Sequence, residues 1–457
     1  MMTESQRAAL AEYAAVKGQC PARERLAALF DDGVYTETGS NLRAGENLAG
    51  VVTAYGYIGG TPAYAFSQDS TVMKGAVSLA HSAKICKMFE LAARNGVPVV
   101  GIYDSCGAFV EDGADALNAY SDILLSMGSL SGVVPMVSVI SGVCAGTMAM
   151  IASSADFSVI TDGAELYLDA SGNNASAESA AKSGAVSAYA KSDAEAMDTV
   201  RRYLSLMPQN NLSPLPEFEF DAPVSAAFDN AENAAESIAD AGSILEVYGE
   251  YGTASYTALC TVSGVTAGIA ATNKTKDKLT SADCSKIARF VRLCDAYSIP
   301  VITVADTEGF DLHGADMVRA GAALAGAYAE ASCAKIALVS GKACGMAYIA
   351  FAGRNVAADA VYALPEAVIA PMDPVSAAEF LYHDKLKDAD DLAAARAQIA
   401  KEYAENEGSA FAAAAKGAAD EVVTAENVRA AVASVLDVTA GKRLNKRLPK
   451  KHNILPL

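Results

Sequence analysis

Two short glycine-containing turns carry the residues of this chain that best suit chemistry. The first turn contains Gly146 and Thr147, and the second contains Gly345, Met346 and Ala347. Small residues let a ligand approach the backbone closely, and the helix predicted after each turn leaves its first N–H groups without a partner. Two such donors form an oxyanion hole, so the sequence predicts one hole in each turn. The alternative is a tight strand-to-helix turn selected only for packing.

The two turns occupy matching places in an internal repeat. Residues 83–109 return about two hundred residues later as residues 285–310, and the segment from Ile140 is echoed by the segment from Val339. A duplication of that length is too long for a solenoid repeat and suits a whole domain. The sequence therefore predicts two tandem domains.

Each repeat shows the same predicted order of helix, buried strand, helix and strand. The predicted strands cover 97–104 and 133–141 in the first copy, and 299–306 and 334–341 in the second. Ligands of open α/β sheets bind at the carboxyl ends of the strands, which is where the turns follow. We therefore predict an α/β fold with duplicated domains at 1–225 and 226–457.

Other candidate catalysts have weaker support. Asp104 and Asp306 end equivalent strands, and we expect their carboxylates to accept loop N–H groups rather than to act as a pair of acids. His313 could act as a base, but a single loop histidine is more often solvated. The sequence lacks the motifs of serine hydrolases, zinc proteases and nucleotide-binding loops. Hydrolysis by a triad and metal or nucleotide chemistry therefore lose most of their support.

Composition narrows the possible partners. The 457 residues are 52% hydrophobic and 19% charged, which is enough for two buried cores. The formal net charge of −19 argues against non-specific binding to nucleic acid or an anionic membrane. No apolar run could span a bilayer and no signal peptide is evident, so we expect a cytoplasmic protein. The nine cysteines include no CxxC pair, so we expect reduced thiols and no metal site.

Five segments carry a resemblance to a known family. They are AFSQDSTVMKGAVSLAHSAKICK (65–87), VVGIYDSCGA (99–108), GVCAGT (142–147), KIARFVRLCDAYSIPVIT (286–303) and LPKKHNILPL (448–457). Together they resemble the carboxyltransferase subunits of biotin-dependent acyl-CoA carboxylases and decarboxylases, which belong to the crotonase superfamily. The resemblance implies tandem crotonase-like (ClpP/crotonase) domains, the first binding the acyl-CoA and the second binding biotin. It also implies an active site between domains of different subunits in a homo-oligomer, a hexamer built from dimers of facing domains.

The same resemblance assigns roles to individual residues. It implies a thioester oxyanion hole at Gly146 and Thr147 and a biotin oxyanion hole at Met346 and Ala347. The implied contacts to the acyl-CoA or to biotin are Gly75, Ala76, Gly107, Ala108, Phe310, Gly345 and Ile349. The family reaction requires no side-chain base, because the ureido nitrogen of biotin takes the proton next to the thioester. Backbone donors hold both transient negative charges.

The chain departs from the family pattern at the candidate site. Where the family reads DSGGAR, this chain has Cys106 and Phe109 in place of a glycine and an arginine. In the second copy the family's Pro-Gly-Phe turn reads Glu-Gly-Phe at 308–310. The segment 169–190 also diverges from the family, and the apolar Ile349 is compatible with small acyl groups.

Biotin is expected to arrive on another protein, because the chain has neither a biotin-acceptor sequence nor an ATP-grasp domain. The implied cofactor is biotin, and the implied substrate is a coenzyme A thioester of the propionyl/methylmalonyl or acetyl/malonyl type. The implied partner is a biotin carrier protein or a biotin carboxylase subunit. Three alternatives remain open: the carboxyltransferase subunit of a sodium-pumping decarboxylase, which reaches the membrane only through partner subunits; a diverged, non-catalytic subunit; and a crotonase-type hydratase or isomerase.

Overall fold

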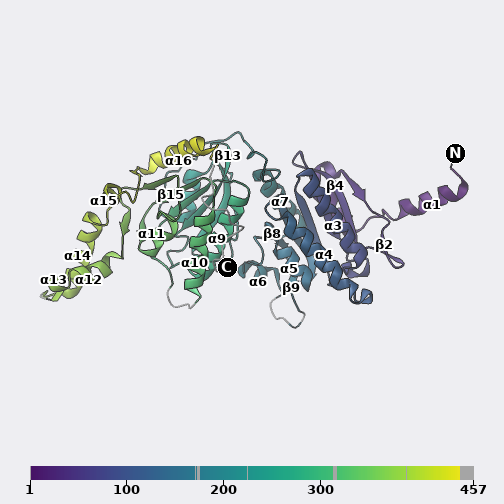
Figure 1. The fold of residues 1–457 in the computed structure, drawn as a ribbon, viewed down its shortest axis with the longest axis horizontal. Helices are drawn as coiled ribbons and strands as arrows, with labels where there is room; N and C mark the ends of the chain where they lie inside the picture. Colours follow the sequence, from purple (N-terminus) through teal and green to yellow (C-terminus); the bar gives the residue numbers. More distant parts are fainter. Residues whose placement is uncertain are drawn as a thin grey trace. The chain divides into compact units, whose positions relative to one another are not determined.

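The chain folds into two compact units, Met1–Pro214 (unit 1) and Leu215–Leu457 (unit 2). The computed structural model describes residues 2–169, 171, 175–223, 225–311, 316–387 and 389–442. Each unit is an α/β structure centred on one sheet (Figure 1). Within the described ranges, no helix is both long enough and apolar enough to cross a membrane.

The described part of unit 1 contains an eight-stranded sheet in the order β1-β4-β5-β6-β7-β8-β10, with β9 beside β7. The strands are β1 (Tyr35–Thr38), β4 (Val51–Ile58), β5 (Thr61–Gln68), β6 (Val99–Ser105), β7 (Met136–Ala145), β8 (Phe157–Thr161), β9 (Glu165–Tyr167) and β10 (Ala188–Ala190), beside a small hairpin of β2 (Arg43–Ala44) and β3 (Asn47–Leu48). Strands β1, β4 and β5 run antiparallel, and the strands from β5 to β10 run parallel. Every residue of β6 is buried, as its continuous apolar run predicts.

Most helices of unit 1 lie around this sheet, but the first one extends away from it with its described side chains exposed (Figure 1). They are α1 (Glu4–Ala15), α2 (Pro21–Leu29), α3 (Leu79–Asn95), α4 (Asp115–Leu130), α5 (Thr147–Ser153), α6 (Ala177–Lys182) and α7 (Asp193–Leu206), with short 3-10 turns η1 (Asp31–Gly33), η2 (Met73–Gly75) and η3 (Val110–Asp112). Helix α3 begins after Ser78, whose side chain caps its first turn, and ends at Gly96 in the left-handed conformation. Helices α3 and α4 lie side by side along the sheet (Figure 1).

Unit 2 repeats this architecture. Its described strands form a seven-stranded sheet in the order β11-β12-β13-β14-β15-β17-β19, parallel from β13 onward. They are β11 (Leu245–Glu246), β12 (Ser255–Val262), β13 (Val265–Thr272), β14 (Val301–Ala305), β15 (Lys335–Val339), β17 (Ala360–Ala363) and β19 (Glu421–Val422), beside a separate pair of β16 (Lys342–Cys344) and β18 (Val368–Ala370). The four strands predicted in the two repeats correspond to β6, β7, β14 and β15.

The helices of unit 2 include a counterpart for each helix of the repeat. They are α8 (Ala231–Ile238), α9 (Ser281–Ala296), α10 (Met317–Glu330), α11 (Met346–Phe351), α12 (Pro374–Leu381), α13 (His383–Lys387), α14 (Leu392–Asn406), α15 (Ala410–Ala415) and α16 (Ala425–Thr439). Helices α9, α10 and α11 correspond to α3, α4 and α5 in the order of the repeat.

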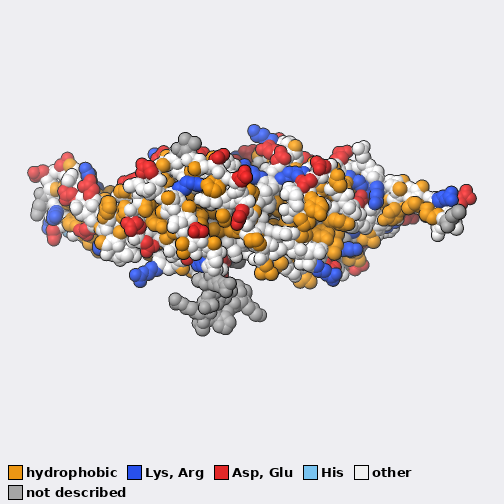
Figure 2. All heavy atoms as spheres, turned by 90° about the horizontal axis from the view of Figure 1, so that it is seen from above, with side chains coloured by type: hydrophobic (Ala, Val, Ile, Leu, Met, Phe, Trp, Pro, Cys, Tyr) orange, Lys and Arg blue, Asp and Glu red, His pale blue; other side chains and the backbone are white. Residues whose placement is uncertain are grey.

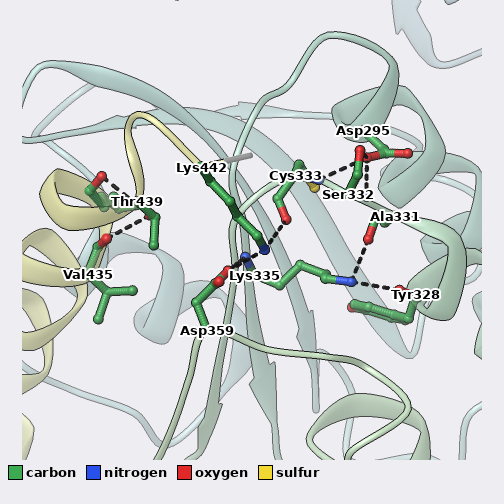
Figure 3. Close-up of polar contacts among 11 residues, drawn as sticks. Asp295, Tyr328, Ala331, Ser332, Cys333, Lys335, Asp359, Val435, Thr439 and Lys442 are labelled. Carbon is green, nitrogen blue, oxygen red and sulfur yellow. Dashed lines mark hydrogen bonds and ion pairs between the residues drawn. The ribbon is translucent and has the colours of Figure 1, made fainter. Parts of the chain in front are cut away.

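Lys442, just after α16, contacts the segments that lead into strands β15 and β17 of unit 2 (Figure 3). Its Nζ atom donates to the carbonyl oxygen of Cys333 at 3.0 Å and lies 2.7 Å from Oδ2 of Asp359. The nearby Lys335 is buried, and its Nζ atom donates to two carbonyls at the end of α10 that would otherwise lack a partner. Residues 443–457, with most of the basic tail, lie outside the described residues.

Candidate functional site

A carboxylate fixes the end of β6, the strand that pairs with β7 just before the first candidate turn. Oδ2 of Asp104 accepts hydrogen bonds from the Ser70 hydroxyl at 2.8 Å and from Nη1 of Arg25 at 2.9 Å. Arg25 also donates to the carbonyl of Ser141, so one guanidinium joins β6 to β7. Gly142 leaves room for this carboxylate, because a Cβ atom there would lie 2.3 Å from Oδ1. Asp104 therefore holds this strand end, and within the described residues its carboxylate bonds to side chains and not to the predicted loop N–H groups.

Four of the predicted contact residues lie together beyond this strand end. Val77 donates its N–H to the carbonyl of Gly107 at 2.9 Å, and a β-bridge pairs Val77 with Ala108. Gly75 has φ of +68°, and a Cβ atom there would lie 2.2 Å from a carbonyl oxygen of β6, so only glycine fits. Ala76 follows directly and is buried. The structure thus brings Gly75 and Ala76 alongside Gly107 and Ala108.

The turn between β7 and α5 differs in one respect from the prediction. Gly146 has φ of +65°, and its N–H donates to the carbonyl of Tyr167 at 2.9 Å. That N–H is therefore paired within the protein, and the positive φ of Gly146 shapes the turn. Helix α5 begins at Thr147, and its first N–H groups, from Thr147 and Met148, have no partner within the helix.

Unit 2 repeats part of this arrangement, although its strand-end carboxylate has a different partner. Oδ1 of Asp306 accepts the N–H of Lys342 at 2.8 Å, as predicted for this carboxylate. A Cβ atom on Gly341 would lie 2.3 Å from the same oxygen, as in the first copy. Leu279 donates to the carbonyl of Gly309 at 3.0 Å, the counterpart of the bond from Val77 in unit 1. The two units therefore share the glycine beside the carboxylate and the hydrogen bond to the loop glycine, whereas the partners of the carboxylates differ.

The remaining predicted residues of unit 2 surround α11. Gly345 has φ of +55°, and its N–H donates to the carbonyl of Ala370, which matches the contact of Gly146. Helix α11 then begins at Met346, which is exposed, and continues with the buried Ala347. Phe310 stacks on Phe351 of the same helix at 6.2 Å between ring centroids. Ile349 lies on the exposed side of α11.

Sequence reasoning missed a charged cluster beside the second turn. Nζ of Lys342 lies 2.7 Å from Oε2 of Glu308 and also contacts a carboxylate oxygen of Asp373. Although burial lowers the pKa of Lys342, its hydrogen bonds to Asp373 and Glu308 raise it above the usual value. A comparison of the two repeats could have found the cluster, because the equivalent residues of unit 1, Val143 and Cys106, carry no such pair.

A buried histidine contacts the glutamine that holds the end of β6. Oε1 of Gln68 accepts the N–H of Asp104 at 3.0 Å, so the amide nitrogen of Gln68 faces Nε2 of His81 at 3.2 Å. Nε2 must therefore be the acceptor, and the proton of the neutral ring sits on Nδ1. Burial, together with the nearby charge of Lys84, lowers the pKa of His81 to about 3. His313, the histidine predicted as a possible base, lies outside the described residues.

Comparison with known proteins assigns the two matched turns and the tandem α/β units to the crotonase-fold carboxyltransferases. A crystal structure of the transcarboxylase 12S hexamer assembly, with hydrolyzed methylmalonyl-coenzyme A bound, matches with a TM-score of 0.88 and 32% identity, covering 98% of this chain and 95% of that chain. A second structure of the same protein, with methylmalonyl-coenzyme A and methylmalonic acid bound, matches with a TM-score of 0.89 and 32% identity, covering 98% and 94%.

The carboxyl transferase domain model matches residues 14–455, and this chain belongs to that family. The chain is 34% identical to the methylmalonyl-CoA decarboxylase subunit alpha of Propionigenium modestum, over 96% of this chain and 94% of that one. It is 33% identical to the methylmalonyl-CoA carboxyltransferase 12S subunit of Propionibacterium freudenreichii subsp. shermanii, over 96% and 92%. These relatives confirm the resemblance, the fold class and the enzyme class expected from the sequence.

Proposed function

We propose that this chain moves a carboxyl group between carboxybiotin, held on a separate carrier protein, and a small acyl-CoA. The observation that carries the proposal is the duplication of one backbone turn in both units, with matched hydrogen bonds, in a member of the carboxyl transferase family. A reaction that develops negative charge on two different ligands needs two such turns. A hydratase or isomerase needs only one, so the second turn favours carboxyl transfer.

In this proposal unit 1 receives the acyl-CoA. The N–H of Thr147 points at the thioester oxygen and stabilises the enolate, with Met148 as the second donor in place of Gly146. Gly107 supports this role, because a Cβ atom there would meet nothing closer than 4.0 Å and a ligand can approach its backbone, whereas Gly75 packs this loop against β6. Ala76 and Ala108 continue the same surface.

Unit 2 receives biotin in this proposal. The N–H groups of Met346 and Ala347 hold the ureido oxygen, and Gly345 keeps the turn tight, since a Cβ atom there would lie 3.0 Å from the carbonyl of Pro371. Phe310 and Ile349 provide apolar surface for the bicyclic ring. When bound, biotin supplies both the carboxyl group and the nitrogen that exchanges a proton with the acyl-CoA. The carboxylates that end β6 and β14 are engaged in supporting the turns, which fits a reaction without a side-chain base.

Methylmalonyl-CoA and propionyl-CoA are the substrate pair we propose. Relatives with 31–34% identity carry the names methylmalonyl-CoA decarboxylase, methylmalonyl-CoA carboxyltransferase and propionyl-CoA carboxylase. The apolar side chain of Ile349 suits a short acyl group. The direction of transfer depends on the partner: a biotin carboxylase drives carboxylation, and a membrane decarboxylase complex drives the reverse reaction.

We also propose a homo-oligomer in which unit 1 of one subunit works with unit 2 of another. Figure 2 shows several groups of apolar side chains on the surface, interspersed with charged ones. On helix α4, the side chains of Leu117 and Leu125 are 69% and 73% exposed to solvent. On helix α10, Val318 is 83% exposed. Exposed large apolar side chains at matching helices indicate protein contacts. The hexamer assembly of the transcarboxylase 12S structures is consistent with this proposal.

The proposal is tested by carboxyl transfer with the purified protein. Incubation with free biotin and methylmalonyl-CoA, followed by mass spectrometry, should show loss of the carboxylated thioester that depends on biotin. Thr147→Pro and Met346→Pro each remove one donor at the first position of a helix, where proline is tolerated. Each should lower the rate by roughly 100-fold or more, because one oxyanion donor is lost.

A matched control separates this effect from proline itself. Ala425 occupies the first position of α16, after Thr424 in an extended conformation, so Ala425→Pro should leave the rate unchanged. Absence of turnover together with absence of CoA binding by calorimetry would indicate a non-catalytic subunit. Conversion of an enoyl-CoA without biotin would instead identify a hydratase.

A further inference from the structure

The charged cluster at the second turn joins three segments of unit 2. Glu308 lies on the turn after β14, Lys342 begins β16, and Asp373 caps α12. The side chain of Lys342 is 25% exposed, so the ammonium group can be reached from solvent. Glu308 is 59% exposed and has no other partner among the described residues, whereas Asp373 also accepts the N–H of Val375 at 3.0 Å. Glu308 is therefore the carboxylate that another anion can displace from Lys342.

Unit 1 shows what the equivalent positions look like without a charged cluster. The repeat places Cys106 where unit 2 has Glu308, and Val143 where unit 2 has Lys342. Around these positions the two turns share the aspartate at the strand end, the glycine that clears it and the bond to the carbonyl of the loop glycine. The scaffold does not require a charge pair, because unit 1 forms the same turn without one. The pair in unit 2 is therefore an addition to the shared turn, and formation of the turn does not account for it.

We propose that Lys342 binds the carboxylate of the carboxylated ureido ligand, and that Glu308 occupies this position until the ligand arrives. The inference rests on the proposed function, which places biotin in unit 2. Biotin itself is neutral at the ureido ring, whereas carboxybiotin carries a carboxylate, so a cation at this turn distinguishes the loaded from the unloaded form. Two carboxylates around one ammonium leave the cluster with net negative charge, and an arriving anion must displace one of them.

Two substitutions break the same ion pair and give opposite results if the inference is correct. The assay follows methylmalonyl-CoA formed from propionyl-CoA and N1-carboxybiotin methyl ester, whose only carboxylate is the transferable one. Lys342→Met removes the ammonium group and should raise the KM for the carboxylated donor about tenfold, as expected for loss of a charged hydrogen bond. Glu308→Gln weakens the competitor and should lower that KM about threefold.

The opposite signs separate binding from support of the fold. If the Lys342–Glu308 pair only holds the turn, both variants raise the KM or lower kcat together, and the inference is wrong. The KM for propionyl-CoA should not change in either variant. Lys401→Met is the matched control, since it removes an exposed lysine of the same unit, 3.7 Å from Glu405, and should leave both constants unchanged.

The same experiment distinguishes this inference from the proposed function. Transfer from the carboxylated donor by the unaltered protein, with equal KM values in all variants, would refute the role of Lys342 and keep the carboxyltransferase. No transfer by the unaltered protein would refute both.

Discussion

His81 makes the stability of unit 1 depend on pH in a predictable direction. Its ring is fully buried and accepts a hydrogen bond from Gln68, whose other end holds the N–H of Asp104. Protonation would place an N–H against the amide nitrogen of Gln68, with donor facing donor. The folded unit therefore keeps His81 neutral, and its pKa lies at about 3 instead of the usual 6.5.

The sign and size of the effect follow from proton linkage. Between pH 6.5 and pH 3 the unfolded chain binds a proton at His81 that the folded chain does not, so stability falls as the pH decreases. Lowering the pH from 7.0 to 5.5 should reduce the free energy of unfolding by about 1.3 kcal/mol through this residue. From about pH 7.5 upward His81 is neutral in both states, and the stability no longer depends on its titration.

The measurement compares the unaltered protein with His81→Gln, whose amide oxygen can still accept the bond from Gln68. Urea unfolding followed by tyrosine fluorescence suits this chain, which has 19 tyrosines and no tryptophan. The variant should be less stable at pH 7.0 but should lose less stability on acidification, and the difference isolates His81 from other titrating groups. Equal pH dependence in the two proteins would show that His81 is not a neutral buried group.

Three further outcomes test the scaffold. Gly142→Ala and Gly341→Ala should each destabilise the protein by about 3 kcal/mol in thermal unfolding, because the new methyl group displaces the carboxylate that ends the preceding strand; Gly128→Ala, in open space on α4, should be neutral or slightly stabilising. Iodoacetamide should label the exposed Cys106 first, because burial raises the pKa of the core thiols, and acyl-CoA should slow that labelling if unit 1 binds it. Lys442→Met should lower the free energy of unfolding by about 1 kcal/mol, because it frees the end of α16. Labelling of all nine cysteines at equal rates would contradict the iodoacetamide prediction. An unchanged melting temperature would contradict the prediction for each destabilising substitution.

Strands and strand ends were predictable because their signals are local. Continuous apolar runs identify β6 and β14, and a single aspartate, Asp104 or Asp306, marks the end of each predicted strand. The bond that occupies the N–H of Gly146 was not predictable, because its acceptor lies in β9, a strand of only three residues with no clear pattern. The partners of Lys342 come from segments about thirty residues away on either side, which no local pattern connects.

The two units show which parts of a duplicated turn are retained and which parts diverge. Each unit buries a lysine on its long helix, Lys84 or Lys286, that donates to a backbone carbonyl near the preceding hairpin. Burial lowers the pKa of both to about 8, which costs stability, yet both copies keep the lysine because its ammonium group satisfies buried backbone carbonyls. In the loops after β6 and β14, Cys106 of the first copy corresponds to Glu308 of the second. Among the described residues neither of these two side chains satisfies a buried carbonyl, so the two positions are free to differ. Under the proposed function, a change of charge beside the turn alters which ligand the turn receives without altering the backbone donors, so one duplicated turn serves two different anions.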